Sequence, residues 1–208
     1  MRIAIIGVGN VGGNLGRLWA ASGHEISFGV RDPQADKVQV LLKESGPTAS
    51  ARSVADAVSS AEVVVLAVPW YVAEEVVRGT DLRGKILVDA TNPIAPGLEL
   101  ATDHTTCGAE LVARWAPDAR VVKAFNTIGA DNLADPTFGD QHATMFVCGD
   151  EPEAKRIVES LSEELGFEAV DAGPLTNARL LEPMAMLWIR LALAEGFGRD
   201  IAFKLLRR

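Results

Sequence analysis

Residues 2–16, RIAIIGVGNVGGNLG, join a short apolar run to a glycine-rich turn and then to a helical stretch. Gly7 permits a tight turn out of the strand, Gly9 removes a side chain where backbone N–H groups must approach a phosphate, and Gly12 lets the helix lie close to the sheet. This spacing, in the order strand, turn and helix, is typical of sites that bind a dinucleotide pyrophosphate at the helix N-terminus. The stretch predicts a Rossmann-like fold with a bound dinucleotide, and a plain strand-turn-helix corner is the alternative.

The pair Arg31-Asp32 follows the second expected strand and bears on which dinucleotide binds. An acidic residue here would bind the ribose hydroxyls of NAD, whereas an arginine would bind the 2′-phosphate of NADP. Asp32 precedes Pro33, and this pair predicts the N-cap and first residue of a helix over 33–44, which would occupy the Asp32 carboxylate. Arg31 is then free to bind a phosphate, with Lys37 as a second cation. The sequence favours NADP over NAD.

Strand and helix patterns alternate along the rest of the chain. Apolar runs predict strands at residues 2–6, 25–29, 48–51, 62–68, 85–89, 120–124, 142–148 and 168–171. Helical patterns fall at residues 10–22, 33–44, shortly after residue 53, at 105–115, 153–165 and 175–206, the last broken near Gly196 and Gly198. The expected class is α/β, a Rossmann-like doubly wound and mostly parallel sheet with a C-terminal helical extension. We expect a dinucleotide-binding core over residues 1–124 and an α/β extension over 125–208 whose helices cap the substrate site.

Parallel strands joined by right-handed crossovers place their C-terminal ends at one edge of the sheet, where ligands bind. Besides the glycine turn and Arg31, this edge comprises residues 67–70, 90–93 and 124–128. Asn92 and Asn126 are neutral hydrogen-bonding side chains suited to ribose and carboxamide groups, and Trp70 offers a flat apolar surface.

Composition and charge exclude several classes of protein. The chain has 208 residues, 48% of them hydrophobic, and a formal net charge of -8, which argues against a nucleic-acid partner. Its most apolar segment, residues 180–194, is interrupted by Glu182, Pro183 and Arg190, so we expect neither a membrane span nor a signal peptide before the first strand. Cys107 and Cys148 form no metal or redox motif. We therefore expect a cytoplasmic enzyme without a metal site.

No acid–base constellation falls on the ligand edge, so no catalytic side chain is assigned. His24, His104 and His142 are expected to be surface or capping residues. Hydride transfer between two stacked rings needs their alignment more than a general acid, whereas a carbonyl reductase would need a proton donor. Lys123 is the nearest candidate for such a donor, and it falls within an expected strand.

Several segments together resemble a known family. They are IAIIGVGNVGGNLGRLWAASGHEISFGVR over residues 3–31, VPW over 68–70, DATNP over 89–93, VKAFNTIGA over 122–130, and the C-terminal LEPMAMLWIRLA and FGRDIAFKLLRR. They resemble the NADPH-dependent coenzyme F-420 (hereafter F420) reductases and their dinucleotide-binding relatives, which include the cytosolic domain of metalloreductases. Val30 and Asn126 depart from the reductases, which have serine and histidine there.

The resemblance implies an NADP(H)-dependent oxidoreductase that transfers a hydride to or from F420 or a similar ring. The expected cofactor-binding residues are Gly7, Gly9, Asn10, Val11, Gly12, Arg31, Lys37, Ala67, Val68, Pro69, Ala90, Asn92, Pro93, Asn126 and Ile128. The second, small-molecule redox substrate is expected to contact Trp70, Asn126 and Ile128. The alternatives are an NADPH-dependent reductase of ferric complexes, flavin or imines, and a catalytically silent NADP-binding sensor. The apolar C-terminal helices would also suit a homodimer interface, or a lid over the substrate.

Overall fold

The computed structural model describes residues 1–103 and 105–208, so the expectation for His104 lies outside the described residues. The strands of the main sheet are β1 (Arg2–Ile6), β2 (Glu25–Gly29), β3 (Ala49–Arg52), β4 (Val63–Leu66), β5 (Ile86–Asp89), β8 (Arg120–Lys123), β11 (Thr144–Gly149) and β12 (Glu168–Asp171). Their order is β12-β11-β8-β5-β4-β1-β2-β3. Neighbours are parallel except β8 and β11, which pair antiparallel. The expected doubly wound, mostly parallel sheet is confirmed.

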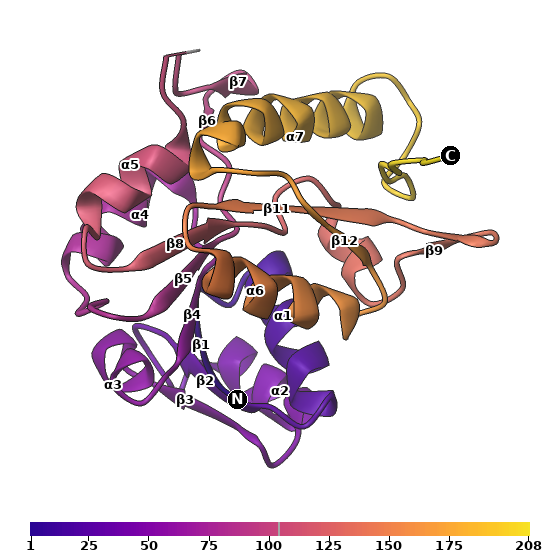
Figure 1. Cartoon of the computed structure of the whole chain (residues 1–208). Helices are drawn as coiled ribbons and strands as arrows, with labels where there is room; N and C mark the ends of the chain where they lie inside the picture. The colour runs from indigo at the N-terminus through magenta and orange to yellow at the C-terminus, as the bar shows by residue number, and fades with distance from the viewer. Residues whose placement is uncertain (104) are drawn as a thin grey trace.

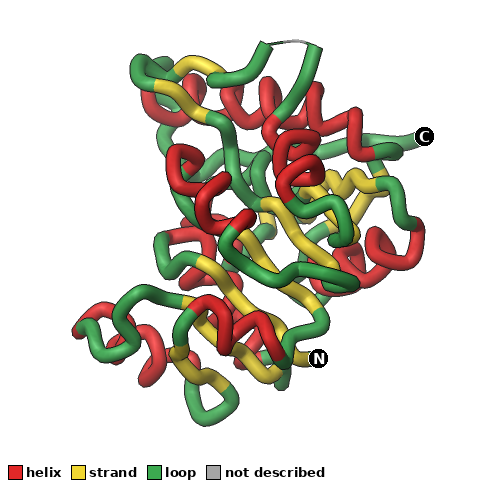
Figure 2. Tube along the Cα trace, turned by 90° about the vertical axis from the view of Figure 1, so that its left-hand side faces the viewer, coloured by secondary structure: helices red, strands yellow, loops and turns green. Residues whose placement is uncertain are grey.

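Helices cover both faces of this sheet (Figures 1 and 2). They are α1 (Asn10–Ala21), α2 (Asp36–Ser45), α3 (Val54–Ser59), α4 (Trp70–Arg78), α5 (Gly108–Trp115), α6 (Pro152–Glu163) and α7 (Ala178–Leu193), with short 3-10 helices η1 (Ala130–Leu133) and η2 (Leu175–Asn177). Two small hairpins, β6 (Ile94–Ala95) with β7 (Glu99–Leu100) and β9 (Thr137–Phe138) with β10 (Gln141–His142), stand apart from the sheet.

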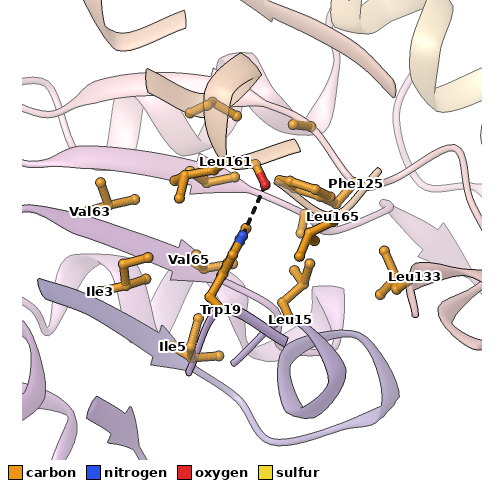
Figure 3. Packing of buried hydrophobic residues seen from close by; sticks show 14 of the residues in the cluster. Ile3, Ile5, Leu15, Trp19, Val63, Val65, Phe125, Leu133, Leu161 and Leu165 are labelled. Carbon is orange, nitrogen blue, oxygen red and sulfur yellow. Dashed lines mark hydrogen bonds between the residues drawn. The ribbon is translucent and has the colours of Figure 1, made fainter. Parts of the chain in front are cut away.

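Each face of the sheet has its own apolar core, because successive strand residues point to opposite sides. Ile3 and Ile5 of β1 belong to the cluster shared with α1, α2 and α6, and Ala4 and Ile6 to the cluster shared with α3, α4, α5 and the start of α7. Trp19 of α1 lies in the first cluster (Figure 3). Its indole Nε1 donates to the carbonyl oxygen of Leu161 at 3.0 Å, which ties α1 to α6.

The helix expected over residues 33–44 begins later in the structure. Helix α2 starts at Asp36 with Ala35 as its N-cap, so Asp32 and Pro33 do not begin it. The Asp32 carboxylate instead accepts a hydrogen bond from the backbone N–H of Gln34 at 2.9 Å, which is a local turn. The expectation that this carboxylate binds a backbone N–H is right, but the helix cap is wrong.

The helix expected over residues 175–206 is also shorter. Helix α7 ends at Leu193, and Gly196 and Gly198 adopt positive φ angles of 79° and 75°, which end the helical conformation. The residues that follow form neither helix nor strand. Two other differences are that α5 begins at Gly108 rather than residue 105, and that α4 was not predicted.

The boundary expected at residue 124 falls directly after β8, and the sheet continues beyond it into β11 and β12. Within the described ranges, no helix combines the length and apolar character that crossing a bilayer requires.

Candidate functional site

The turn between β1 and α1 has a geometry that only glycine fits at two positions. Gly7 has a φ of +100°, and a Cβ placed there would lie 2.4 Å from the carbonyl oxygen of Ala67. A Cβ on Gly12 would lie 2.0 Å from the carbonyl oxygen of Gly7. Both separations are far inside van der Waals contact, so the backbones of the turn, β4 and α1 touch directly.

Gly9 differs from those two, because a Cβ at this position would have no atom of the described residues within 4 Å. Gly9 is the N-cap of α1, and neither a capping side chain nor an acidic residue occupies the first helical turn. The N–H groups of Asn10, Val11 and Gly12 come at this helix start, where backbone donors have no intrahelical acceptor. Open space, free donors and the positive end of the helix dipole suit an anion such as a pyrophosphate.

These differences give a paired prediction. Gly12→Ala should destabilise the fold by about 1–3 kcal/mol, because the new methyl group overlaps the Gly7 carbonyl. Gly9→Ala should change the free energy of unfolding by less than about 0.5 kcal/mol. It should weaken NADP(H) binding roughly tenfold, because its methyl group occupies the space before the helix start. Thermal unfolding and calorimetric titration measure the two effects. Equal cofactor affinity of Gly9→Ala and wild type would contradict the assignment.

A groove of about 500 Å³ begins at this turn and runs along the ends of β1, β2 and β4. Of the predicted cofactor residues, it is lined by Gly7, Gly9, Arg31, Lys37, Ala67, Val68 and Pro69. Arg31 and Lys37 are both exposed, and neither has an ion-pair partner among the described residues. The groove thus presents two free cations near a helix N-terminus, although Asp32 also lies on its rim.

A second group of predicted residues lies at the ends of β5 and β8 and does not line this groove. Asn92 Nδ2 donates to the carbonyl oxygen of Asn126 at 3.0 Å, and Asn126 Nδ2 donates to Asn92 Oδ1 and to the Leu181 carbonyl oxygen, both at 3.1 Å. Asn126 is 4% exposed, and its Oδ1 has no hydrogen-bond partner within the described part of the chain. A buried acceptor without a donor is costly, so Asn126 Oδ1 suits a hydroxyl or amide group of a ligand.

We call Asn92 and Asn126 the amide pair. The other predicted residues of this region are buried around it. Ala90 is 7% and Ile128 8% exposed, and Pro93 is also buried. Trp70 does not line the groove. Its ring lies 5.4 Å from that of Trp115, and a Cβ on Gly108 would come within 3.2 Å of it, so it packs between α4 and α5.

Behind the amide pair lies a fully buried ionic triad. Lys123 Nζ donates to Asp89 Oδ2 at 2.9 Å and to the Thr91 carbonyl oxygen at 2.6 Å, and lies 3.1 Å from Glu182 Oε1. The Glu182 carboxylate also accepts from the backbone N–H groups of Gly108 and Ala109, at the start of α5. The triad has two carboxylates but one ammonium group. The N–H groups of Gly108 and Ala109, together with the positive end of the α5 dipole, help to offset the negative charge of Glu182.

Lys123 is therefore a structural cation rather than an accessible proton donor. Burial alone would lower its pKa, but the neighbouring charges of Asp89 and Glu182 outweigh burial and raise the pKa above its ordinary value. The side chain is 0% exposed and its ammonium group contacts three acceptors.

The remaining titratable candidates lie away from the groove. His24 is 8% exposed and is thus buried rather than on the surface, and its Nε2 lies 2.6 Å from Glu164 Oε2, whereas His142 is exposed on β10. Cys107 and Cys148 are buried free thiols, and burial raises the pKa of each to about 12. Neither thiol is a reactive thiolate near neutral pH.

Comparison with known proteins decides the family. The family model described as NADP oxidoreductase coenzyme F420-dependent matches residues 2–93. The F420-dependent NADP reductase of Methanothermobacter marburgensis is 32% identical over 92% of this chain and 92% of its own length. The chain belongs to the F420-dependent NADP oxidoreductase family. A solved structure of a candidate F420-dependent NADP reductase from Arthrobacter sp. FB24 covers 100% of both chains with 33% identity and a TM-score of 0.86.

This F420-dependent NADP oxidoreductase family member also resembles proteins with other names. The rat metalloreductase STEAP3 is 32% identical over 89% of this chain, but the chain spans only 36% of that protein. An Aspergillus terreus reductive aminase in complex with NADPH shares the fold, with 19% identity and a TM-score of 0.70.

Several residues that line the groove were not among the predicted cofactor-binding residues, although Asp32 was weighed as the NAD alternative. They are Ile6, Val8, Gly29, Val30, Asp32, Ala35, Val38, Val54, Tyr71, Val72 and Val76. Tyr71, Val72 and Val76 come from α4, and Tyr71 is 86% exposed. The apolar pattern Val72, Ala73, Val76 and Val77 has helical spacing and could have revealed α4.

Proposed function

We propose that this protein transfers a hydride between NADP(H) and the ring of F420 or a similar acceptor. The observation that carries the proposal is the groove, where the open helix start at Gly9 and the free cations Arg31 and Lys37 come together. Membership of the F420-dependent NADP oxidoreductase family supports the same reaction class.

The residues present fit NADP(H). The pyrophosphate would be held by the N–H groups at residues 10–12, and the 2′-phosphate by Arg31 and Lys37. The apolar lining near α4 would hold the adenosine. The unpartnered Oδ1 of Asn126 would accept a hydrogen bond from the nicotinamide end, beside Val68, Asn92 and Ile128. When bound, NADPH supplies the hydride.

This chain contributes binding and orientation rather than proton transfer. The side chains brought to the amide pair are neutral, and the nearby ammonium of Lys123 is held by three acceptors. Such a site suits transfer between two aligned rings, because alignment is the main requirement of that step. A second candidate, reduction of ferric or flavin acceptors, is favoured by the 32% identity with STEAP3, which is named a metalloreductase.

The proposal is tested by stopped-flow mixing of the purified protein with NADP and reduced F420. The expected result is loss of the reduced deazaflavin together with appearance of NADPH absorbance at equal rates. Turnover of flavin or ferric acceptors, with none of F420, would favour the second candidate. Tight NADP binding without turnover across all these acceptors would indicate a silent sensor and exclude both reactions.

We also propose a homodimer through α7, in a cytoplasmic enzyme whose segment 125–208 caps the substrate site. Met186 and Trp188 of α7 are buried against the protein, but Leu180 and Leu187 are 68% and 51% exposed. Two exposed leucines seven residues apart lie on one helix face, which suits packing against a second copy. Both cysteines are free, in agreement with a reducing compartment. Light scattering of wild type and Leu187→Glu tests the dimer, and a wild-type monomer would exclude it.

A further inference from the structure

The segment after α7 is attached to the sheet although it contains no helix or strand. In Figure 1 it runs from the end of α7 to the C-terminus on the side of the molecule where β12 and β9 lie. Thr144 of β11 donates its backbone N–H to the Phe203 carbonyl oxygen at 2.9 Å, and Leu205 N donates to Thr144 Oγ1 at 3.0 Å. Lys204 also forms an ion pair with Glu168 of β12. We call residues 199–205 the tail.

Asn132 of η1 holds the other side of the tail. Its Nδ2 donates to the carbonyl oxygens of Arg199 and Ile201, both at 3.0 Å. An amide nitrogen has two hydrogens, so the donor capacity of this side chain is fully used. Trp188 of α7 adds a hydrogen bond from Nε1 to the same Ile201 carbonyl oxygen at 2.8 Å. Asn132 is 7% exposed, so these bonds form away from bulk water.

The 3-10 helix η1 follows directly on the loop that carries Asn126 and Ile128. Gly129, its N-cap, lies so close to Trp188 that a Cβ there would be 2.5 Å from the indole ring. On the other side, Asn14 of α1 donates from Nδ2 to the Ala130 carbonyl oxygen at 3.0 Å. The end of the loop thus packs against α7, and η1 is held by α1 and by the tail.

The start of this loop has a conformation that needs such support. Phe125 is a non-glycine residue with a φ of 61°, which is unfavourable and persists only where the surroundings enforce it. Its N–H donates to the Met145 sulfur at 3.2 Å, and its ring meets Trp19 edge-on, with ring centroids 5.5 Å apart. Asn126, the next residue, makes the hydrogen bonds to Asn92 and Leu181 described above.

We propose that Asn132 is a positioning residue that, through its hydrogen bonds to the tail, fixes loop 125–129 and hence the Asn126 amide. Asn132 does not line the groove. Its catalytic consequence rests on the proposed function, since it concerns the nicotinamide end of the site. The structural part of the proposal concerns only the order of the loop.

Asn132→Asp in the full chain tests the proposal, because it keeps the size of the side chain, removes both donors and places a carboxylate against two carbonyl oxygens. Amide hydrogen exchange at residues 126–133 and 199–205 is expected to accelerate at least roughly tenfold, as for a locally opened segment. The rate of hydride transfer should fall roughly tenfold to a hundredfold through misalignment, while the Kd for NADP measured by calorimetry changes less than about twofold. Asn177→Asp is the matched control, since Asn177 Nδ2 also donates to a backbone carbonyl oxygen, that of Ala172, beside η2.

Asn132→Leu is a second variant, which removes both donors to the tail without placing a charge beside the two carbonyl oxygens. It should accelerate amide hydrogen exchange at residues 126–133 and 199–205, by a smaller factor than Asn132→Asp. If Asn132→Asp does not fold, this variant alone tests the proposal. Unchanged exchange at residues 126–133 in the folded variants overturns the proposal. If the wild type transfers no hydride to any acceptor, the proposed function fails, but the exchange measurement still tests the role of Asn132.

Discussion

Replacement of Lys123 by methionine is expected to lower the free energy of unfolding by about 3–5 kcal/mol, a large part of the total stability of an ordinary domain. The substitution keeps a long apolar stem but removes the ammonium group that lies between Asp89 and Glu182. Both carboxylates are at most 1% exposed, so two negative charges would remain buried without a cation. Chemical denaturation followed by circular dichroism measures the decrease in the free energy of unfolding. Failure of the variant to accumulate as folded protein would also agree with this prediction.

The matched control for this prediction is Lys43→Met, the same change at an exposed lysine in the last turn of α2. It should alter the free energy of unfolding by less than about 0.5 kcal/mol. Adding Glu182→Gln to Lys123→Met should recover part of the loss, because only one carboxylate would then remain unpaired. A Lys123→Met protein within about 1 kcal/mol of wild type would show that the triad contributes little.

Replacement of Arg31 by alanine is expected to weaken NADP(H) binding by roughly 10- to 100-fold and to leave NAD(H) binding nearly unchanged. The guanidinium lines the groove and has no ion-pair partner in the described part of the chain, so it is available for the 2′-phosphate that distinguishes the two cofactors. Hydrogen bonds to charged groups contribute about 1.5–3 kcal/mol, which sets this range. Calorimetric titration with both cofactors, at one fixed salt concentration, measures the ratio of affinities.

Arg52→Ala provides the control for Arg31→Ala. Arg52 ends β3, the neighbour of β2, is also exposed, and does not line the groove. This variant should bind NADP(H) as wild type does. An equal loss of NADP(H) and NAD(H) affinity in Arg31→Ala would contradict 2′-phosphate recognition by this residue.

Most of the sheet could be predicted because its signals are local. The unbroken apolar runs of β4 and β5 are typical of parallel strands covered on both faces, and the glycine turn fixes where α1 begins. The helix after Asp32 was placed too early because an Asx turn and a helix cap use the same hydrogen bond from a carboxylate to a nearby N–H. The sequence pattern does not distinguish these two structures.

The features that could not be predicted depend on contacts between distant residues. Glu182 and Lys123 lie 59 positions apart in the chain, so neither residue indicates its partner, although a carboxylate within an apolar helix signals that some partner exists. The apolar and basic composition of the tail predicts a continuation of α7, whereas in the structure hydrogen bonds with Asn132 and Thr144 hold the tail in a course without helix. The sequence predicts the amide pair of Asn92 and Asn126 at the ligand edge. It does not predict that this pair lies outside the lining of the groove.

Because β11 runs antiparallel to β8, the ligand edge contains the start of β11 as well as the C-terminal ends of the parallel strands. In the register of β8 and β11, Cys148 lies opposite Lys123, so the chain before Cys148 passes the end of β8 toward the ligand edge. Residues near the start of β11 therefore meet residues just after β8, as the Met145 sulfur meets the N–H of Phe125. The half of the edge beside the groove is built from the parallel strands β1, β2 and β4, near the start of the chain. A ligand that spans the edge would therefore meet parallel strand ends at the groove and, at β8 and β11, the end of one strand beside the start of another.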